Sequence, residues 1–499
     1  MPNQPNLVFR SATVLDGTGA EPIVTDVAVT DDRISHIGQA PAGEEEINCE
    51  GYVLSPGFID AHGHDDGAFI RHPDMTFKLS QGVTSVVNGN CGFSAIPASP
   101  DVDWRRASGG ILAGLRGDFT DLEGYFRAAL AEGPAINNMM LVGHNTVRSL
   151  VMGEAKTAPS AHELRLMREH ILLAMEQGAC GFSSGLIYRP GRYSDTEEVT
   201  TLASTVAEFG GLYTTHMRNE GDHLLEAVEE ALTIGKDAAV HTHISHHKAA
   251  GEPNWGKVTE SLSRIEQALA DGQGVSLDVY PYTAGSGRMI EYFNLDRINE
   301  DLARVIRIAS CPAFPTFEGR MLVDIASEEG RSLTELVHTI LTAPRGDQTL
   351  CIQFLIDEQD IQTNLKWRDM MVGSDGIPNL KGKPHPRLYG TFPRVLSRYV
   401  RDQNILSLAE AVRRMTSLTA ATFGISDRGQ IKEGWFADLT LFDPERVHDE
   451  ATYDAPQQLA SGIHTVVVGG KVAFQLGQHR NARSGSMLRY RRDAYAPQR

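Results

Sequence analysis

Short apolar stretches occur at both ends of the chain. Near the start they cover residues 7–9, 27–30 and 33–38, and near the end they cover residues 437–442 and 464–472. Stretches of this length with polar or Gly residues between them are typical of strands joined by turns. We therefore expect the two ends to fold together into one small β-sandwich, with the middle of the chain inserted between its halves.

The middle of the chain repeats a different pattern, in which a short apolar strand is followed by a polar or Gly-rich loop and an amphipathic helix. This order indicates parallel βα units, and eight units in series predict a closed (β/α)8 TIM-type barrel. The expected strands end near His62/His64, Cys91, His144, Ser183/Ser184, His216, His246, Tyr280/Tyr282 and Asp375. Because barrel enzymes carry their chemistry at the carboxyl ends of the strands, these polar residues are candidates for a functional site.

The spacing of the elements gives a domain division. We expect residues 1–56 to form the first part of the β-sandwich, residues 57–424 the barrel, and residues 425–499 the second part of the β-sandwich with a C-terminal tail. About ninety residues separate the seventh and eighth strands, far more than an ordinary βα connection needs. Residues 289–350 are therefore predicted to form an inserted subdomain or lid.

Composition narrows the classes of partner. A formal net charge of −18 without a block rich in Lys or Arg argues against nucleic acid or an anionic membrane surface. The N-terminus lacks the pattern of a secretory signal, and no run of about eighteen apolar residues predicts a membrane span. The five cysteines are scattered and odd in number, which favours a reducing compartment. We expect a cytoplasmic protein with no membrane partner.

The first chemical motif places His62 and His64 directly after the first barrel strand. A strand directs residues two apart to the same face, so both imidazoles can point at one metal ion. A His pair alone is weak evidence, but His216 and Asp375 fall at the expected ends of the fifth and eighth strands. The coincidence predicts a metal site at the mouth of the barrel.

The sixth strand offers four histidines and leaves its ligand ambiguous. Alternation puts His241, His243 and His247 on one face and His246 on the other. We favour His246 because it lies at the end of the strand, where the barrel mouth should be. His243 is the alternative, and otherwise His241 and His243 are core or supporting groups.

Seven segments together carry a family resemblance that extends over nearly the whole chain. They are PGFIDAHGH (56–64), NGNCGFS (88–94), SSGLIY (183–188), THMRNE (215–220), ISHHK (244–248), DVYPY (278–282) and GSDG (373–376). As a set they resemble the D-aminoacylase branch, the N-acyl-D-amino-acid deacylases, of the metal-dependent amidohydrolase superfamily. The resemblance implies a metal-bearing barrel with a small β-sandwich, and hydrolysis of small-molecule N-acyl-D-amino acids to a carboxylate and a free D-amino acid.

The resemblance also implies a ligand set. Many relatives hold two metals with a carbamylated lysine on the fourth strand, but residues 178–186 contain no lysine. In the D-aminoacylase branch a cysteine at the end of the second strand takes over, and Cys91 occupies that place. By resemblance, a tight Zn²⁺ is bound by Cys91, His216 and His246, and a second, weaker site is formed by His62, His64 and Asp375.

Amide hydrolysis needs an activated water, a polarised carbonyl and a proton for the departing amine. Zinc supplies the first two, and Asp375 is expected to act as general base and then to protonate the leaving nitrogen. The resemblance implies that Lys248, Tyr280 and Ser286 contact the substrate α-carboxylate.

Two further residues are candidates for the substrate pocket. Tyr188 is a candidate for the same pocket as the three carboxylate-binding residues. Arg288 stands where the family has a small or polar residue after Ala-Gly-Ser, and it favours a substrate with an acidic side chain.

Two other functions remain open on the sequence. A cyclic amidase of the hydantoinase or dihydroorotase type shares the barrel and the His-x-His motif, although the absent fourth-strand lysine and the presence of Cys91 argue against it. A non-catalytic barrel used as a scaffold is the second alternative, and the complete set of expected ligands argues against that. The chain is compatible with a homo-oligomer, and neither the acyl group nor the preferred D-amino acid follows from the sequence.

Overall fold

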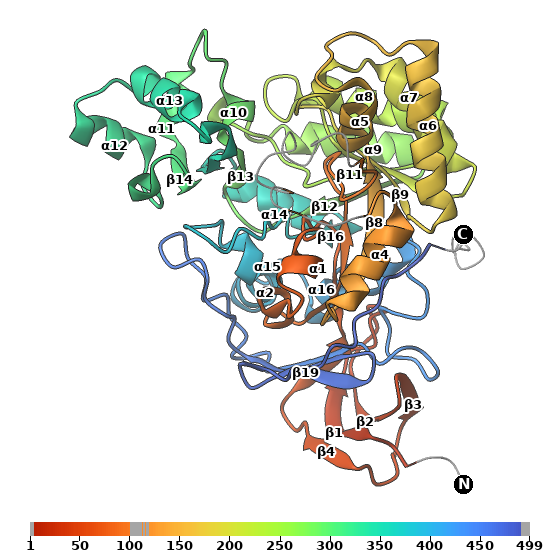
Figure 1. The fold of residues 1–499 in the computed structure, drawn as a ribbon. Coiled ribbons are helices and arrows are strands. Elements are labelled where there is room, and N and C mark those ends of the chain that lie inside the picture. Colours follow the sequence, from red (N-terminus) through yellow and green to blue (C-terminus); the bar gives the residue numbers. More distant parts are fainter. Residues whose placement is uncertain (1–3, 100–111, 113–114, 116–118, 491–499) are drawn as a thin grey trace.

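A closed parallel barrel forms the centre of the molecule (Figure 1). The computed structural model describes residues 4–99, 112, 115 and 119–490. Within these ranges the barrel strands are β6 (Phe58–Asp60), β7 (Val83–Asn88), β8 (Asn137–Gly143), β9 (Gly181–Gly185), β10 (Leu212–His216), β11 (His241–Ile244), β12 (Val275–Val279) and β16 (Met370–Val372). A parallel bridge between Gly63 and Gly376, in the segments that follow the first and last strands, closes the ring. The predicted (β/α)8 barrel is confirmed.

Amphipathic helices cover the outside of the barrel, so most of its strand residues are buried. The helices that follow or flank the strands are α1 (Ala68–Arg71), α2 (Thr76–Leu79), α4 (Leu122–Ala131), α5 (His144–Met152), α6 (Ala161–Glu176), α7 (Thr196–Ala207), α8 (Leu224–Asp237), α9 (Val258–Ala270), α14 (Glu358–Lys366), α15 (Arg387–Arg394), the π-helix η6 (Val395–Asp402), α16 (Leu408–Arg414) and α17 (Ser417–Thr422). Short 3-10 turns lie at η2 (Gly191–Tyr193) and η3 (Glu252–Asn254). Among the described residues, no helix has both the length and the apolar character that a membrane crossing requires.

The two ends of the chain share one sheet below the barrel (Figure 1). Its strands are β1 (Leu7–Val14), β2 (Ile23–Thr30), β3 (Arg33–Ile37), β4 (Glu45–Asn48), β5 (Val53–Pro56), β17 (Leu439–Phe442), β18 (Ile463–Val468), β19 (Lys471–Gln475) and β20 (Gln478–His479). Strand β5 pairs in parallel with β1 on one side and antiparallel with β17 on the other, so it joins the N-terminal strands to the C-terminal strands. The expectation that both ends build one small domain is confirmed.

An inserted subdomain separates β12 from β16. Its antiparallel sheet contains β13 (Gly285–Arg288), β14 (Ile306–Ser310) and β15 (Leu350–Gln353), and its helices are α10 (Met289–Tyr292), α11 (Glu300–Arg304), η4 (Pro315–Phe317), α12 (Leu322–Glu329), α13 (Leu333–Thr342) and η5 (Gly346–Gln348). Residues such as Ile308, Leu322 and Val337 give it a hydrophobic cluster of its own. The insertion predicted for residues 289–350 is present, whereas the exact domain boundaries stay predictions.

Candidate metal centre

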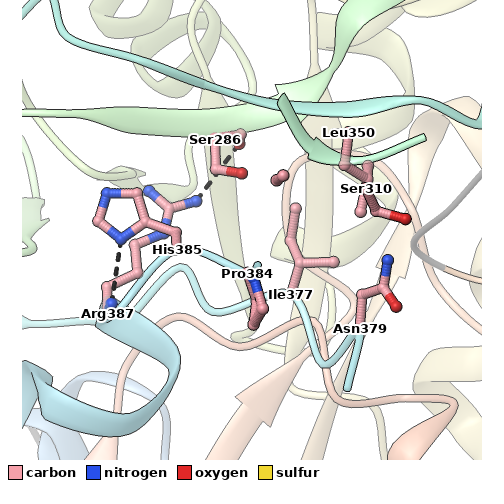
Figure 2. Close-up of a pocket in the computed structure, with 9 residues that line it drawn as sticks. Ser286, Ser310, Leu350, Ile377, Asn379, Pro384, His385 and Arg387 are labelled. Carbon is pink, nitrogen blue, oxygen red and sulfur yellow. Dashed lines mark hydrogen bonds between the residues drawn. The ribbon is translucent and has the colours of Figure 1, made fainter. Parts of the chain in front are cut away.

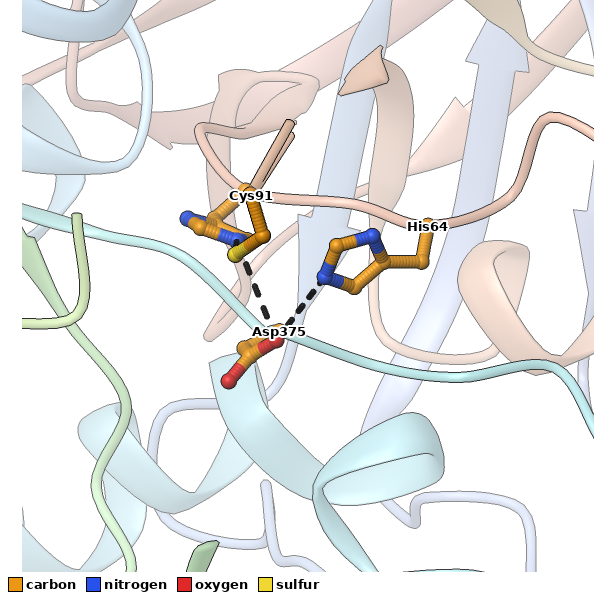
Figure 3. Close-up of side chains that lie close together, drawn as sticks. His64, Cys91 and Asp375 are labelled. Atoms are coloured by element: carbon orange, nitrogen blue, oxygen red, sulfur yellow. Dashed lines mark hydrogen bonds and ion pairs between the residues drawn. The ribbon is translucent and has the colours of Figure 1, made fainter. Parts of the chain in front are cut away.

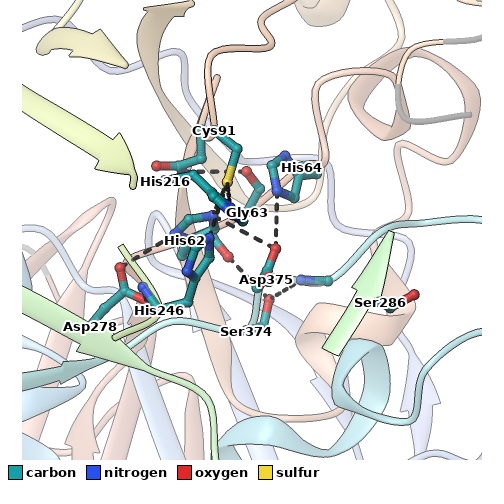
Figure 4. A network of polar contacts seen from close by, with 12 residues as sticks. His62, Gly63, His64, Cys91, His216, His246, Asp278, Ser286, Ser374 and Asp375 are labelled. Atoms are coloured by element: carbon teal, nitrogen blue, oxygen red, sulfur yellow. Dashed lines mark hydrogen bonds and ion pairs between the residues drawn. The ribbon is translucent and has the colours of Figure 1, made fainter. Parts of the chain in front are cut away.

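The six expected metal ligands meet at the carboxyl ends of the barrel strands (Figure 4). His62 and His64 follow β6, Cys91 follows β7, His216 ends β10, His246 follows β11, and Asp375 follows β16. All six side chains are buried. The barrel thus converges groups that lie more than three hundred residues apart in the chain.

The backbone turns sharply at three of these residues. Cys91, His246 and Asp375 have backbone φ angles of 53°, 36° and 48°, in the left-handed region that residues other than Gly rarely adopt. Each such residue costs about 1 to 2 kcal/mol, which is the kind of strain found at functional sites. The eighth strand also needs a Gly at residue 373, because a Cβ there would lie 2.5 Å from the Cβ of His62.

Cys91, His216 and His246 form the first cluster. The Cys91 sulfur lies 3.3 Å from Nε2 of His246 and 3.7 Å from Nδ1 of His216. A tetrahedral zinc ion with ordinary Zn–S and Zn–N bonds separates sulfur from nitrogen by about 3.5 Å. One thiolate and two imidazoles are also the donors that zinc prefers. The cluster therefore fits a zinc ion in both geometry and chemistry.

The second cluster shares Cys91 with the first. The Cys91 sulfur lies 3.3 Å from Nε2 of His62, and Oδ1 of Asp375 lies 3.7 Å from the same nitrogen and 3.1 Å from Nε2 of His64. Figure 3 shows His64 and Asp375 directed at each other beside Cys91. The ligand atoms of the four residues lie within 4.8 Å of one another. This cluster can hold a second ion beside the first.

Charge in the two clusters favours the ligand form of the cysteine. Burial alone would raise the pKa of the Cys91 thiol, but the nearby charges of His62 and His246 lower it well below its usual value. Burial alone would lower the pKa of His62, but the charges of Cys91 and Asp278 raise it well above its usual value. A deprotonated thiol is the form that binds zinc.

Glu220 is a neighbouring carboxylate that contacts both histidines of the first cluster. Its carboxylate lies 3.0 Å from Nδ1 of His246 and 3.5 Å from Nε2 of His216. Lys248 donates to the same carboxylate and lies 2.8 Å from Nδ1 of His246. Carboxylates in this position orient metal-binding imidazoles and fix their tautomers. Lys248, expected to contact the substrate carboxylate, is thus placed beside His246 and is paired with Glu220.

A fully buried lysine ties the first and eighth strands together beneath the second cluster. Lys78 lies 2.5 Å from Asp60, 3.0 Å from Asp65 and 3.1 Å from the hydroxyl of Ser374. Asp60 in turn accepts hydrogen bonds from the backbone N–H groups of His62 and Ser374. One ammonium group and two carboxylates therefore hold the two loops that carry His62, His64 and Asp375.

Arg387 is a buried cation at the site that the sequence analysis did not single out. Its Nη1 lies 2.9 Å from Oδ2 of Asp375, and its guanidinium lies 4.5 Å from the ring centre of Tyr280. Within the described residues, its Nε has no hydrogen-bond partner. Burial alone would raise the pKa of Asp375, but the Arg387 charge and the hydrogen bond to His64 keep it well below its usual value. Asp375 is therefore ionised at neutral pH.

A small cavity lies beside Arg387, between the inserted subdomain and the loop after β16. Figure 2 shows Ser286 and Leu350 lining one side of it, and Ile377, His385 and Arg387 lining the other. Its free volume is about 10 Å³, which is the room that one water molecule takes. The insertion thus contributes directly to the wall of the site.

The other expected substrate residues lie around this wall. The ring of Tyr188 packs against that of His216 at a centroid distance of 4.6 Å. Ser286 lines the cavity, but its hydroxyl donates to the carbonyl of Cys351. Arg288 is mostly buried and forms an ion pair with Glu291 at 3.4 Å. The positive charge of Arg288, which is expected to attract an acidic substrate side chain, is therefore partly balanced by the carboxylate of Glu291.

Two other polar strand ends have supporting roles. His144 and Arg148 both bind the buried carboxylate of Glu198, which links α5 to α7. The hydroxyl of Ser183 contacts the carbonyl of Gly89 and accepts from the N–H of Gly92, so it fixes the loop that carries Cys91.

The sequence contained signals for the residues that were missed. Arg387 belongs to a basic stretch at residues 381–387 in an otherwise acidic chain. Glu220 follows His216 by four residues, and Asp278 lies two residues before Tyr280 on the seventh strand. None of these positions reveals its partner until the strands are placed in order.

Comparison with known proteins agrees with the geometry. A profile of the Amidohydrolase family matches residues 45–315 and 268–474. The chain is 42% identical to the D-aminoacylase of Alcaligenes xylosoxydans xylosoxydans over 95% of this chain and 96% of that one, and 40% identical to the N-acyl-D-glutamate deacylase of the same organism over 94% and 93%. It also resembles the structure of N-acyl-D-glutamate deacylase from Bordetella bronchiseptica, complexed with zinc and a phosphonate inhibitor that mimics the tetrahedral intermediate. The TM-score is 0.90 at 38% identity, over 98% of this chain and 100% of that one.

Proposed function

The chain belongs to the amidohydrolase family, in the branch that contains D-aminoacylase and the N-acyl-D-amino-acid deacylases, and on that premise we propose that it removes the acyl group from N-acyl-D-amino acids. The products are a carboxylate and a free D-amino acid. The observation that carries the proposal is the position of Cys91, whose sulfur lies within 3.7 Å of ring nitrogens of three histidines. This arrangement replaces the fourth-strand lysine of the cyclic amidases, and β9 carries no lysine.

The metal that fits this donor set is zinc. Cys91, His216 and His246 would hold one ion tightly, and His62, His64 and Asp375 would form a weaker site beside it. When bound, zinc acidifies a water molecule and polarises the carbonyl oxygen of the amide. The zinc reported for the Bordetella bronchiseptica relative supports this assignment.

Asp375 is the proposed proton carrier. Its carboxylate projects into the mouth of the barrel and is held ionised by Arg387, so it can accept a proton from the attacking water. The same group then delivers the proton to the departing nitrogen, which leaves as a neutral amine. His64, at 3.1 Å, orients the carboxylate for both transfers.

Arg387 and Tyr280 are the proposed anchors of the substrate α-carboxylate. A buried guanidinium that lies over an aromatic ring, and whose Nε has no hydrogen-bond partner among the described residues, offers a charged donor to a carboxylate. Ser286 and Tyr188 complete this wall of the pocket in the proposal. In this proposal Lys248 does not bind the substrate directly. It acts through Glu220, with which it forms an ion pair.

The decisive experiment compares N-acetyl-D- and N-acetyl-L-amino acids on metal-depleted protein, with and without added zinc. We expect zinc-dependent release of the free D-amino acid and no release from the L-series. Release from neither series, but from a cyclic amide such as a hydantoin, would overturn the proposal.

The role of Asp375 has its own test. We expect Asp375→Asn to abolish turnover while the tight zinc ion is retained, because Cys91, His216 and His246 are unchanged. Asp449→Asn, a buried carboxylate paired with Arg394 away from the metal ligands, is the matched control. An active Asp375→Asn variant would refute the assignment as general base.

The preference for the side chain is tested with a substrate panel. If Arg288 selects acidic substrates, N-acetyl-D-glutamate should be hydrolysed faster than N-acetyl-D-leucine, and Arg288→Met should remove the difference. Equal rates on both substrates in the unchanged protein would refute this role of Arg288, whose charge is paired with Glu291.

The remaining expectations stay predictions. All five cysteines are buried free thiols, as expected for a reducing compartment such as the cytoplasm. Nucleic acid as a partner remains disfavoured by the charge of −18. A homo-oligomer is also untested.

A further inference from the structure

A line of buried polar groups leads from the metal site into the body of the barrel. Nδ1 of His62 lies 3.3 Å from Oδ2 of Asp278, and Nε2 of His243 lies 2.7 Å from the same oxygen. Nδ1 of His243 then lies 2.9 Å from the hydroxyl of Ser276, which is 2.8 Å from Nε2 of His241. Figure 4 shows the contact between His62 and Asp278, where this line meets the metal site.

The register of the strands shows that this line runs through the barrel interior. Thr214 pairs with His243, and His243 pairs with Ser276, so these side chains share the face of the sheet that carries His216. Barrel interiors are ordinarily filled by branched apolar side chains. Buried polar groups in such a place are costly unless every donor meets an acceptor, so a continuous chain of them requires an explanation.

The hydrogen bonds of Asp278 determine which groups donate and which accept along this line of polar groups. Its carboxylate is surrounded by three donors, which are Nδ1 of His62, Nε2 of His243 and the backbone N–H of His246. An ionised carboxylate only accepts hydrogen bonds, so His243 donates from Nε2 and its Nδ1 accepts from Ser276. For the same reason His62 donates from Nδ1, and in the neutral form that binds a metal its Nε2 offers a lone pair toward Cys91 and Asp375.

We propose that His243, held by Ser276, is a positioning residue that aims Asp278 at the metal site. Without the 2.7 Å bond from His243, Oδ2 of Asp278 keeps only the longer 3.3 Å contact with His62, so the carboxylate is held less firmly toward His62 and the turn at His246. Supporting groups of this kind affect metal affinity by roughly 10- to 100-fold. The inference rests on the metal site of the proposed function, but it concerns how firmly the ion is held rather than which substrate is hydrolysed.

The test measures zinc affinity rather than turnover. Metal-depleted protein is titrated with Zn²⁺ in competition with a chromophoric chelator, for the unchanged protein and for His243→Leu and His243→Gln. Gln can place its amide nitrogen near the position of Nε2 and so restore the donor to Asp278, whereas Leu cannot. Co²⁺-loaded samples report the thiolate-to-metal charge-transfer band of Cys91 as a spectroscopic check.

His247 provides the matched control. It is also fully buried on β11's extension and also makes two side-chain hydrogen bonds, to Asn364 and Ser261, but these partners lie away from the metal ligands. His247→Leu therefore removes a buried imidazole of equal size without touching Asp278's carboxylate.

We expect His243→Leu to weaken binding of at least one zinc ion by roughly 10- to 100-fold, His243→Gln to remain close to the unchanged protein, and His247→Leu to leave zinc affinity unaltered. Unchanged affinity in His243→Leu, or equal losses in His243→Leu and His247→Leu, would overturn the proposal. If His243→Leu fails to fold, Ser276→Ala tests the proposal through the bond that holds His243 in place, and unchanged zinc affinity in that variant overturns the proposal instead. Failure of the unchanged protein to bind zinc at all would count against both this inference and the proposed function.

Discussion

Replacing Lys78 with methionine should destabilise the protein strongly although Lys78 contacts neither proposed ligand atoms nor solvent. The Lys78 ammonium, Asp60 and Asp65 are all fully buried. Methionine matches the volume of the lysine stem but leaves two buried carboxylates without a cation. Removing one partner of a buried ion pair costs about 3 to 5 kcal/mol.

The length of the chain sets how far this loss of unfolding free energy shifts the midpoint of thermal unfolding. Unfolding entropy of about 2.1 cal/mol/K per residue over 499 residues gives about 1 kcal/mol/K, so Lys78→Met should lower the midpoint of a single thermal transition by about 3 to 5 °C. Differential scanning calorimetry of the zinc-loaded protein measures the shift. The comparison must be made at one zinc concentration, because bound ligand also raises the midpoint.

The variant Asp65→Asn tests whether unbalanced charge, rather than altered packing, causes the loss of stability in Lys78→Met. This variant leaves one ammonium facing one carboxylate, so we expect a midpoint near or above that of the unchanged protein. Burial is the main reason that the pKa of Asp65 is raised to about 6 even with Lys78 present, so its charged form costs more free energy here than that of an ordinary aspartate. If Asp65→Asn loses as much stability as Lys78→Met, the reasoning from unbalanced charge is wrong.

Three further predictions concern the metal, the substrate and acid stability. Cys91→Ser should lose the tight zinc ion, and elemental analysis that finds a full equivalent after dialysis would contradict the ligand assignment. Arg387→Met should lower kcat/KM on N-acetyl-D-amino acids by roughly 10- to 150-fold, the value of a hydrogen bond to a charged group, and steady-state kinetics at saturating zinc measure it. Burial alone would raise the pKa of Glu198, but its bonds to His144 and Arg148 bring that pKa below its usual value. A lowered folded-state pKa contributes stability above pH 4.5 that is lost as the pH falls, so Glu198→Gln should show a shallower loss of thermal midpoint on acidification, and parallel curves would refute this.

The fold followed from local patterns because each pattern has a single architectural solution. Eight βα units in series form a closed barrel, and the polar ends of its strands must then lie at one face. The placement of His216 and Asp375 at the ends of β10 and β16 required only that the apolar stretches before them be strands. The choice of His246 over His243 followed from the same rule, and the structure places His246 in the cluster with Cys91.

The supporting groups did not follow, because their partners come from other parts of the chain. Arg387 meets Asp375 only after the loop behind β16 folds back under the inserted subdomain. Lys78 lies on a short helix, α2, where a lysine is expected to be exposed. Its burial is decided by two carboxylates on β6 and the turn that follows it, and no periodicity in α2 records their position.

The joining role of β5 has a consequence for synthesis of the chain on the ribosome. One edge of β5 pairs with β1, but the other waits for β17, which begins at Leu439. At ordinary rates of translation, of about 5 to 20 residues per second, the interval between the two strands is roughly 20 to 80 s. During that time the nascent N-terminal sheet has an open edge, and such edges pair readily with other chains. Sequestration of that edge by a chaperone during this interval should therefore increase the yield of folded protein.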